Sequence, residues 1–225
     1  DFTVNAMYYD PRTQVVVDYH KGIEDAQKRV LRMIGDAEQR YREDPVRIIR
    51  AVRFGAKLAH LGFALEAKTA KPLRLCQPLL HEVPQSRLFD EMLKLLQTGH
   101  ALASVAQLQK LGLAQGIYPL LDVVVQRADE PLVRAALQDT DRRVSEGKAV
   151  APSFLLACLL WQDVQTGWQQ RQASGEHAFP ALQAAIDGVL ARRIGGISGR
   201  GTLAAAPRAR WGLPPGWGCR RGPRS

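Results

Sequence analysis

The chain has 225 residues, a length that suits one large domain or two small ones with a real hydrophobic core. Its 46% hydrophobic and 24% charged residues are typical of a globular protein and exclude a fibrous or wholly disordered chain. The formal net charge of +9 resembles that of a nucleic-acid-binding protein, but eight arginines and no acidic residue lie in residues 191–225, so the rest of the chain carries only +1.

Cysteine content and hydropathy indicate a protein of a reducing compartment. The three cysteines, Cys76, Cys158 and Cys219, are odd in number and far apart, which argues against a disulfide framework. The longest apolar run, "FLLACLLW" from Phe154 to Trp161, is too short to cross a bilayer and predicts a buried helix. We therefore expect a cytoplasmic protein without a membrane span.

The chain opens with two predicted strands, in residues 3–9 and 14–19. In "DFTVNAMYYD" every second side chain is assigned to one face of a half-buried strand. These side chains are Phe2, Val4, Ala6 and Tyr8. The turn residues "DPRT" separate the two runs, so we expect a β-hairpin, and its open edge needs a partner.

A short helix in "GIEDAQKRV" and a short strand in "VLRMIG" follow, and the periodicity is then helical to about residue 193. The clearest helix lies in "REDPVRIIRAVRFGAKLAHLG". Asp44 is its predicted N-cap, Pro45 suits the first helical position, and Gly62 can end the helix.

This helix has two distinct faces. Its apolar residues fall within an arc of about 100°. They are Ile48, Ile49, Val52, Ala56 and Ala59. Arg50, Arg53 and Lys57 share another face, with Arg47 beside them.

A second strong helix lies in "SRLFDEMLKLLQTG", with Ser86 as its predicted cap and Gly99 at its end. Its expected core residues are Leu88, Met92, Leu95 and Leu96. Further helices are expected at residues 101–111, 131–144, 152–168 and 181–193. The predicted fold class is therefore mostly α, with one β-hairpin at the start.

Residues 191–225 do not continue this pattern. They contain eight glycines and four prolines, a composition that cannot pack a core. Either they form a basic RNA-binding tail with interleaved tryptophans, or they are a non-native, frame-shift-like sequence from GC-rich DNA. The abrupt end of the helical period favours the second interpretation.

Three stretches together resemble bacterial poly(A) polymerases, which are class II nucleotidyltransferases related to the CCA-adding enzymes. They are "DFTVNAMYYD", "IGDAEQRYREDPVRIIRAVRFGAKL" and "PQSRLFDEMLKLL", in the family's order. The resemblance covers residues 1–190. It implies a head domain with a small sheet, a helical neck that selects the incoming nucleotide, and further helices that hold RNA.

The resemblance also implies two-metal chemistry in the head. There a Gly-Ser loop and a D-x-D pair hold two Mg²⁺ ions that activate the RNA 3′-hydroxyl. In the family these elements precede the Asp at which this sequence starts, so we expect an N-terminally truncated piece that is inactive by itself. No metal ligands are assigned, and Mg²⁺ is expected only in the full-length enzyme, with ATP as substrate.

Four parts are expected along the chain. Residues 1–20 are a remnant of the head sheet, and residues 21–100 are neck, nucleotide-recognition and RNA-binding helices. Residues 101–190 are a helical, RNA-binding body, and residues 191–225 are the disordered basic tail described above.

The resemblance assigns nucleotide binding to Asp44, Arg47, Arg50, Arg53 and Asp1. Asp44 and Arg47 are expected to read the base edge, since a carboxylate accepts from an exocyclic amine and a guanidinium donates in a fixed fork. Arg50 and Arg53 lie near it, and Asp1 is expected to position the ribose. Without the family motif, Asp44 would be only a cap and the arginines a solvated face.

Three residues are expected to support that pocket. Arg87 and Glu91 stand four apart on one helix, which by itself predicts an exposed ion pair. The resemblance implies that their helix buttresses the neck and holds the arginines of the pocket. Asn5 belongs to the motif that ends the head sheet.

Three functions remain open at this point. The leading one is a poly(A) polymerase that adds AMP from ATP to RNA 3′ ends without a template, as a monomer. A CCA-adding tRNA nucleotidyltransferase shares all three motifs. A non-catalytic helical RNA-binding protein is the alternative of another class, and the five histidines show no metal-ligand spacing.

Overall fold

The computed structural model describes residues 1–113, 115–116 and 118–194. Its first elements follow from local sequence signals. The expected hairpin is confirmed: β1 (Met7–Asp10) pairs antiparallel with β2 (Val15–Asp18), and Tyr8 stands opposite Val17. Predictions for residues 195–225 lie outside the described residues.

The first predicted strand is wrong over its first half. Residues Thr3–Asn5 form a 3-10 helix, η1, which breaks the two-residue period of a strand. Phe2 is fully buried and bridges to Met33, whereas Tyr8 is 67% exposed. The four alternating side chains therefore do not share one face.

A short helix and two short strands join the hairpin to the helical part. Helix α1 (Gly22–Gln27) leads to β3 (Val30–Leu31), as expected, and β3 pairs in parallel with β4 (Ala64–Leu65). Helix α2 (Ala37–Glu43) follows, and the Asp36 carboxylate caps it by accepting from the Gln39 amide at 2.8 Å.

Helix α3 (Val46–Leu58) is the predicted central helix. Most of its apolar face is buried, but Ala59 is exposed because α3 has already passed into the 3-10 helix η2 (Ala59–Leu61). Gly62 ends this segment with φ +82°, as predicted. The prediction that Asp44 caps α3 is wrong: Pro45 holds the cap position, without a side-chain hydrogen bond.

The neighbours of α3 come from the next stretch of the chain. Short helices α4 (Ala67–Ala70), α5 (Leu73–Cys76) and η3 (Gln77–Glu82) lead to α6 (Gln85–Leu96) and α7 (Ala101–Lys110). Helix α3 packs against both α6 and α7. Ser86 does not cap α6, because the helix starts one residue before it, after Pro84.

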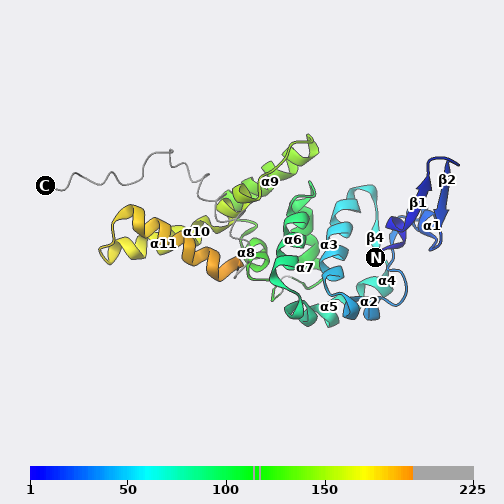
Figure 1. Cartoon of the computed structure of the whole chain (residues 1–225), viewed down its shortest axis with the longest axis horizontal. Coiled ribbons are helices and arrows are strands. Elements are labelled where there is room, and N and C mark those ends of the chain that lie inside the picture. The colour runs from blue at the N-terminus through cyan, green and yellow to red at the C-terminus, as the bar shows by residue number, and fades with distance from the viewer. Residues whose placement is uncertain (114, 117, 195–225) are drawn as a thin grey trace.

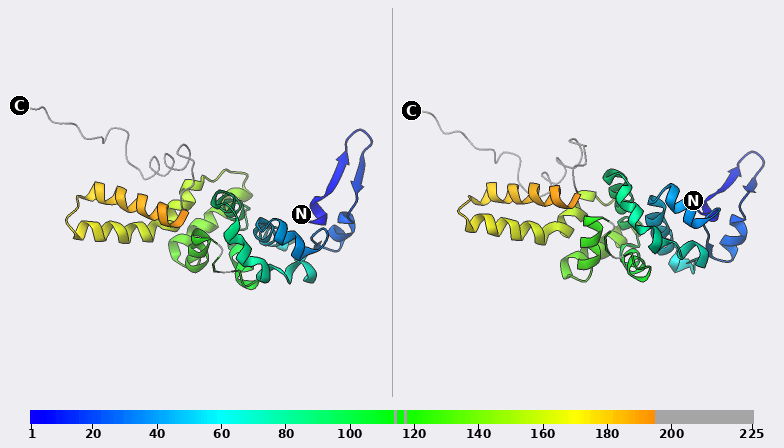
Figure 2. Two further views of the ribbon diagram at one scale, coloured as in Figure 1. Left: turned by 60° about the horizontal axis from the view of Figure 1, so that its bottom comes forward. Right: turned by 90° about the horizontal axis from the view of Figure 1, so that it is seen from below.

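Four helices complete the described chain: α8 (Pro119–Arg127), α9 (Pro131–Ser145), α10 (Pro152–Ala173) and α11 (Ala178–Ile194). Helix α8 was not predicted, and the other three extend the predicted ranges. The β1–β2 hairpin and the α10–α11 pair form opposite ends of an elongated molecule (Figures 1 and 2). Among the described residues, no helix is long and apolar enough to cross a membrane.

Gly22 at the start of α1 lies close to the backbone of the N-terminal segment. A Cβ at this position would lie 2.3 Å from the Thr3 carbonyl oxygen, a backbone atom that cannot swing aside. At Gly188 in α11, by contrast, a Cβ would meet only the Arg192 side chain, at 3.6 Å.

We expect Gly22→Ala to lower the free energy of unfolding by about 1–3 kcal/mol, because the added methyl group overpacks this contact. Urea titration of the purified chain measures the change. Gly188→Ala is the matched control and is expected to be neutral or stabilising, since alanine is the better helix former. Equal midpoints for Gly22→Ala and the unmodified chain would contradict the close approach.

Candidate functional site

Three arginines of α3 form a row that faces the N-terminal segment and α6. Arg47, Arg50 and Arg53 recur every third residue, so their side chains lie along one side of the helix. Each side chain is 30% exposed or less. Charges held in such surroundings need partners, and each arginine has one.

Asp1 pairs with two members of the row. Its carboxylate forms an ion pair with Arg50, and its Oδ1 lies 3.5 Å from Nε of Arg47. Arg47 also donates to the Arg40 carbonyl at 2.8 Å, and it lies 3.4 Å from the Glu43 carboxylate. The structure therefore brings together three of the residues to which the resemblance assigns nucleotide binding: Asp1, Arg47 and Arg50.

Arg53 lies at the α6 end of the row. Its guanidinium is 3.4 Å from Glu91 Oε2 and stands over the Phe54 ring, 4.8 Å from the centroid. Burial lowers the pKa of Arg53, and the Glu91 carboxylate opposes that shift. Glu91 also accepts from Lys94 at 2.9 Å.

Arg87 pairs with a residue beside α3 and not with Glu91 on its own helix. Its Nη2 lies 3.2 Å from both carboxylate oxygens of Asp44, across the gap between α6 and the start of α3. Arg87 and Glu91 therefore each pair with a residue on α3 or beside it rather than with each other, and the role in holding the pocket that the resemblance implies stays a prediction. Asp44 and Glu91 thus tie α6 to both ends of the arginine row.

Asn5 lies apart from the arginine row. It is exposed, and its Oδ1 accepts from the Phe2 amide at 3.1 Å, which closes the 3-10 turn. This bond holds the backbone that leads to Asp1.

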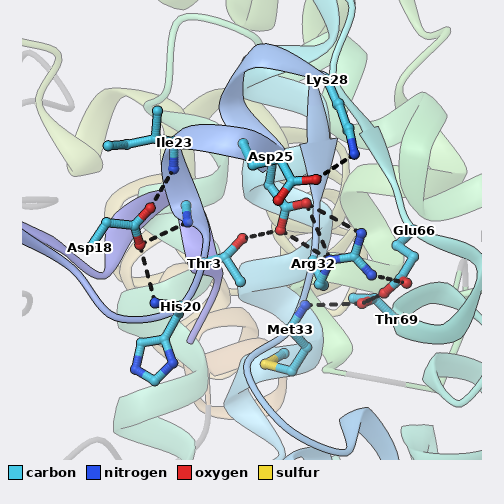
Figure 3. A network of polar contacts seen from close by, with 12 residues as sticks. Thr3, Asp18, His20, Ile23, Asp25, Lys28, Arg32, Met33, Glu66 and Thr69 are labelled. Atoms are coloured by element: carbon cyan, nitrogen blue, oxygen red, sulfur yellow. Dashed lines mark hydrogen bonds and ion pairs between the residues drawn. The ribbon is translucent and has the colours of Figure 1, made fainter.

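A second polar cluster, which the sequence did not predict, joins the N-terminal segment to α4 (Figure 3). The carboxylate of Asp25, which is 4% exposed, accepts from Thr3 Oγ1 at 2.7 Å and from Arg32 Nε at 3.0 Å. Arg32 also pairs with Glu66, and Thr69 Oγ1 accepts from the Met33 amide at 3.0 Å. No local pattern marks these contacts, because most join residues more than twenty positions apart.

The residues present do not fit a Mg²⁺ site. Within the described part of the chain, no three His, Cys, Asp or Glu side chains are placed to hold a metal ion. The sequence Asp139-Thr140-Asp141 has D-x-D spacing but lies in α9, where Asp139 pairs with Arg142 and Arg143. Asp141 instead accepts from the Ala101 amide at 2.6 Å at the start of α7, and burial raises its pKa.

Comparisons with known proteins agree with the motifs. The family model described as "Poly A polymerase head domain" matches residues 1–32, and "Probable RNA and SrmB- binding site of polymerase A" matches residues 62–124. Poly(A) polymerase I of Salmonella typhi is 35% identical over 230 aligned residues, which cover 100% of this chain and 49% of that protein. The chain is similar to poly(A) polymerases along its whole length. It spans about half the length of that relative.

Two further matches are to a CCA-adding enzyme and to a solved structure. The CCA-adding enzyme of Streptococcus pneumoniae (strain CGSP14) is 47% identical over 96 residues, covering 43% of this chain and 23% of that protein. A solved structure called "tRNA-processing enzyme (apo form 2)" aligns with a TM-score of 0.51 at 21% identity, covering 84% of this chain and 63% of that one. This structural likeness supports the fold alone.

The Asp25 cluster makes a stability prediction. Burial raises the pKa of Asp25, but the hydrogen bonds from Arg32 and Thr3 outweigh it, so the pKa is lowered overall. Arg32→Met removes the main donor, and we expect it to destabilise the chain by about 1–3 kcal/mol at neutral pH. The exposed pair of Lys28 and Glu24 provides the control, and Lys28→Met is expected to change stability much less.

The loss of unfolding free energy in Arg32→Met should depend on pH. Because the pKa of Asp25 is lower in the folded than in the unfolded chain, its contribution is present above the unfolded-state value of about 3.9. It is lost as the pH falls through the lower folded-state pKa. Urea titrations from pH 7 to pH 2.5 should show the two proteins converging, and a constant gap would refute the assignment.

Proposed function

We propose that the chain is part of a poly(A) polymerase that transfers AMP from ATP to RNA 3′ ends without a template. The observation that carries this proposal is the 35% identity to a poly(A) polymerase I along the whole chain, motifs included. Residues 1–20 would be the remnant of the head, residues 21–100 the neck and residues 101–190 the body. The protein would act as a cytoplasmic monomer on mRNA or small RNA.

The arginine row would recognise the nucleotide. Arg47 can donate its planar fork to the base edge, with Arg50 and Arg53 beside it and Asp1 near the ribose. Asp44 already accepts from Arg87. A carboxylate has about four acceptor sites, so Asp44 can still accept from an exocyclic amine. Glu91 and Arg87 would act as positioning residues for Arg53 and Asp44, and Asn5 for Asp1.

Mg²⁺ would supply charge stabilisation and an activated 3′-hydroxyl in the full-length enzyme. Since residues 1–194 hold no suitable carboxylate cluster in their described parts, we route no chemical step through a metal here. The contribution of this chain would be to bind and orient nucleotide and RNA.

CCA addition is the second candidate, and the 47% identity over 96 residues to a CCA-adding enzyme favours it. That match is confined to 43% of the chain, whereas the polymerase match runs through all of it. The shorter match therefore covers the part that both enzyme types share, and the polymerase remains the main proposal.

Arg47→Ala tests the nucleotide-recognition role. We expect the affinity of the purified chain for ATP to fall by about tenfold or more, because a charge-assisted hydrogen bond is lost. Isothermal titration calorimetry measures the change. The control is Arg42→Ala on α2, whose guanidinium pairs with Glu38 outside the row. Similar losses in both variants would show that charge, rather than the row, governs binding.

Nucleotide choice tests the proposed activity. A longer protein that contains this chain and the family's head segment should extend RNA with ATP, and CTP should not be incorporated. Incorporation of CTP would establish the CCA-adding alternative. The 225 residues alone are expected to give no ATP-dependent extension, because the head's metal-binding segment is not among them. Extension by the isolated chain would contradict this expectation.

A further inference from the structure

The β1–β2 hairpin and the start of α1 carry a large share of the exposed apolar side chains. Six of the ten exposed large hydrophobic side chains of the described chain lie between residues 8 and 23. They are Tyr8, Tyr9, Val15, Val16, Tyr19 and Ile23. The hairpin projects from the helical part in both views of Figure 2, so its faces are open to a ligand. Apolar surface gathered in this way marks a place where a ligand or a partner binds.

The two faces of the hairpin carry different tyrosines. Side chains alternate across a strand, so Tyr8 and its cross-strand neighbour Val17 share one face, whereas Tyr9 and Val16 share the other. Tyr19 comes two positions after Val17, where the same period reaches the face of Tyr8 again. We call Tyr8, Val17 and Tyr19 the tyrosine face. Tyr8 is 67% exposed and Tyr19 77%, and neither side chain has a ring contact or hydrogen bond within the described residues.

A polar hollow of about 330 Å³ adjoins the tyrosine face, because the two residues that follow Tyr19 line it. Its lining residues are His20, Lys21, Glu24, Asp25 and Arg32. Both carboxylates of the hollow are engaged, since Glu24 pairs with Lys28 and Asp25 with Arg32. The side chain of Lys21 has no ion pair or hydrogen bond in the part of the chain that the structure describes. Its charge is therefore available to an anion that enters the hollow.

The two carboxylates of the hairpin are held by backbone amides. Asp18 accepts from the amides of residues 20, 22 and 23 at 2.9–3.1 Å (Figure 3). Asp10, nearer the turn, accepts from the Arg12 amide at 2.9 Å. Because amide dipoles offset part of each negative charge, these carboxylates oppose an approaching phosphate less than free ones would.

We propose that bases of single-stranded RNA stack on the tyrosine face while Lys21 holds a phosphate of the same strand in the hollow. The proposal rests on the proposed function, which makes RNA the substrate. It places this contact within residues 1–32, outside residues 62–124 that match the RNA-binding family model. Every base has a π-face, so exposed phenol rings beside a cation suit a single strand of any sequence. An apolar protein surface, by contrast, would leave Lys21 and the hollow without a counterpart.

The test compares variants of the purified chain that lose rings from opposite faces of the hairpin. Tyr8→Leu combined with Tyr19→Leu removes both rings of the tyrosine face but keeps apolar side chains there. The single variants Tyr8→Leu and Tyr9→Leu form a matched pair, since Tyr9 is 60% exposed and lies on the other face. Lys21→Asn removes the cation, and asparagine tolerates the φ of +61° at this position. All variants keep residues 62–124 and the eight arginines of residues 191–225, so RNA binding by those segments cancels in the comparison.

Fluorescence anisotropy with a labelled 20-nucleotide oligo(U), without ATP or Mg²⁺, gives the dissociation constant at several salt concentrations. We expect the double leucine variant to bind about tenfold more weakly or worse at 0.1 M salt, because base–aromatic stacking is lost. Its slope of log affinity against log salt should stay unchanged, since no charge is removed. Lys21→Asn should instead lower that slope by about 0.7, the contribution of one phosphate contact on a single strand. Tyr9→Leu should change the affinity by less than about twofold, because its ring lies off the tyrosine face.

Further measurements separate the possible failures. Tyr8→Phe combined with Tyr19→Phe keeps both rings and should keep the original affinity, and thermal melting should show that every variant is folded. Photocrosslinking of an oligo(U) that carries 5-iodouridine, followed by peptide mass spectrometry, should place crosslinks on Tyr8 or Tyr19.

Original affinity in the double leucine variant overturns the proposal and leaves an apolar protein surface as the partner of the tyrosine face. An equal loss in Tyr8→Leu and Tyr9→Leu overturns it as well, because the two faces would then not differ. Because binding is measured without ATP or Mg²⁺, these results are independent of whether the longer protein adds AMP.

Discussion

Helix α3 has to keep three guanidinium groups charged while they are largely removed from water, and the arrangement of the surrounding segments follows from this constraint. An arginine cannot give up its proton to escape burial, so each needs an acceptor nearby. The acceptors come from separate segments: Asp1 at the start of the chain, Glu43 at the end of α2, and Glu91 in α6. Pairing the arginines therefore fixes those segments around α3.

Pairing of buried charges also stabilises the end of the molecule that carries the hairpin. Asp25 is buried and remains ionised because Thr3 and Arg32 donate to it. Arg32 also forms an ion pair with Glu66. Gly22 allows α1 to approach the Thr3 backbone closely enough for these bonds. The ion pairs of the interior thus organise the fold.

Much of the helical part could be predicted because burial imposes a 3.6-residue period that is visible locally. Buried Ile48, Ile49 and Val52 illustrate this in α3. The end of the following 3-10 helix was also predictable, because Gly62 can adopt the positive φ found there. The errors have local causes as well. Asp44 and Ser86 have good capping chemistry, but Asp44 binds Arg87 and α6 starts before Ser86. The first strand was placed too early because a 3-10 turn at Thr3–Asn5 carries a similar mixture of residues.

The sequence by itself determined the mostly helical class, the hairpin, the family motifs and the arginine row, since each depends on residues within about one element of each other. Only the tertiary structure decided which carboxylate meets which arginine. The sequence assigned Arg87 and Glu91 to a helix that holds the arginines of the pocket, but it did not give their partners: Arg87 meets Asp44, 43 residues earlier, and Glu91 meets Arg53. A half-buried ion pair forms where packing brings two charges together and excludes water from them. The separation of the two residues along the sequence does not determine whether this happens.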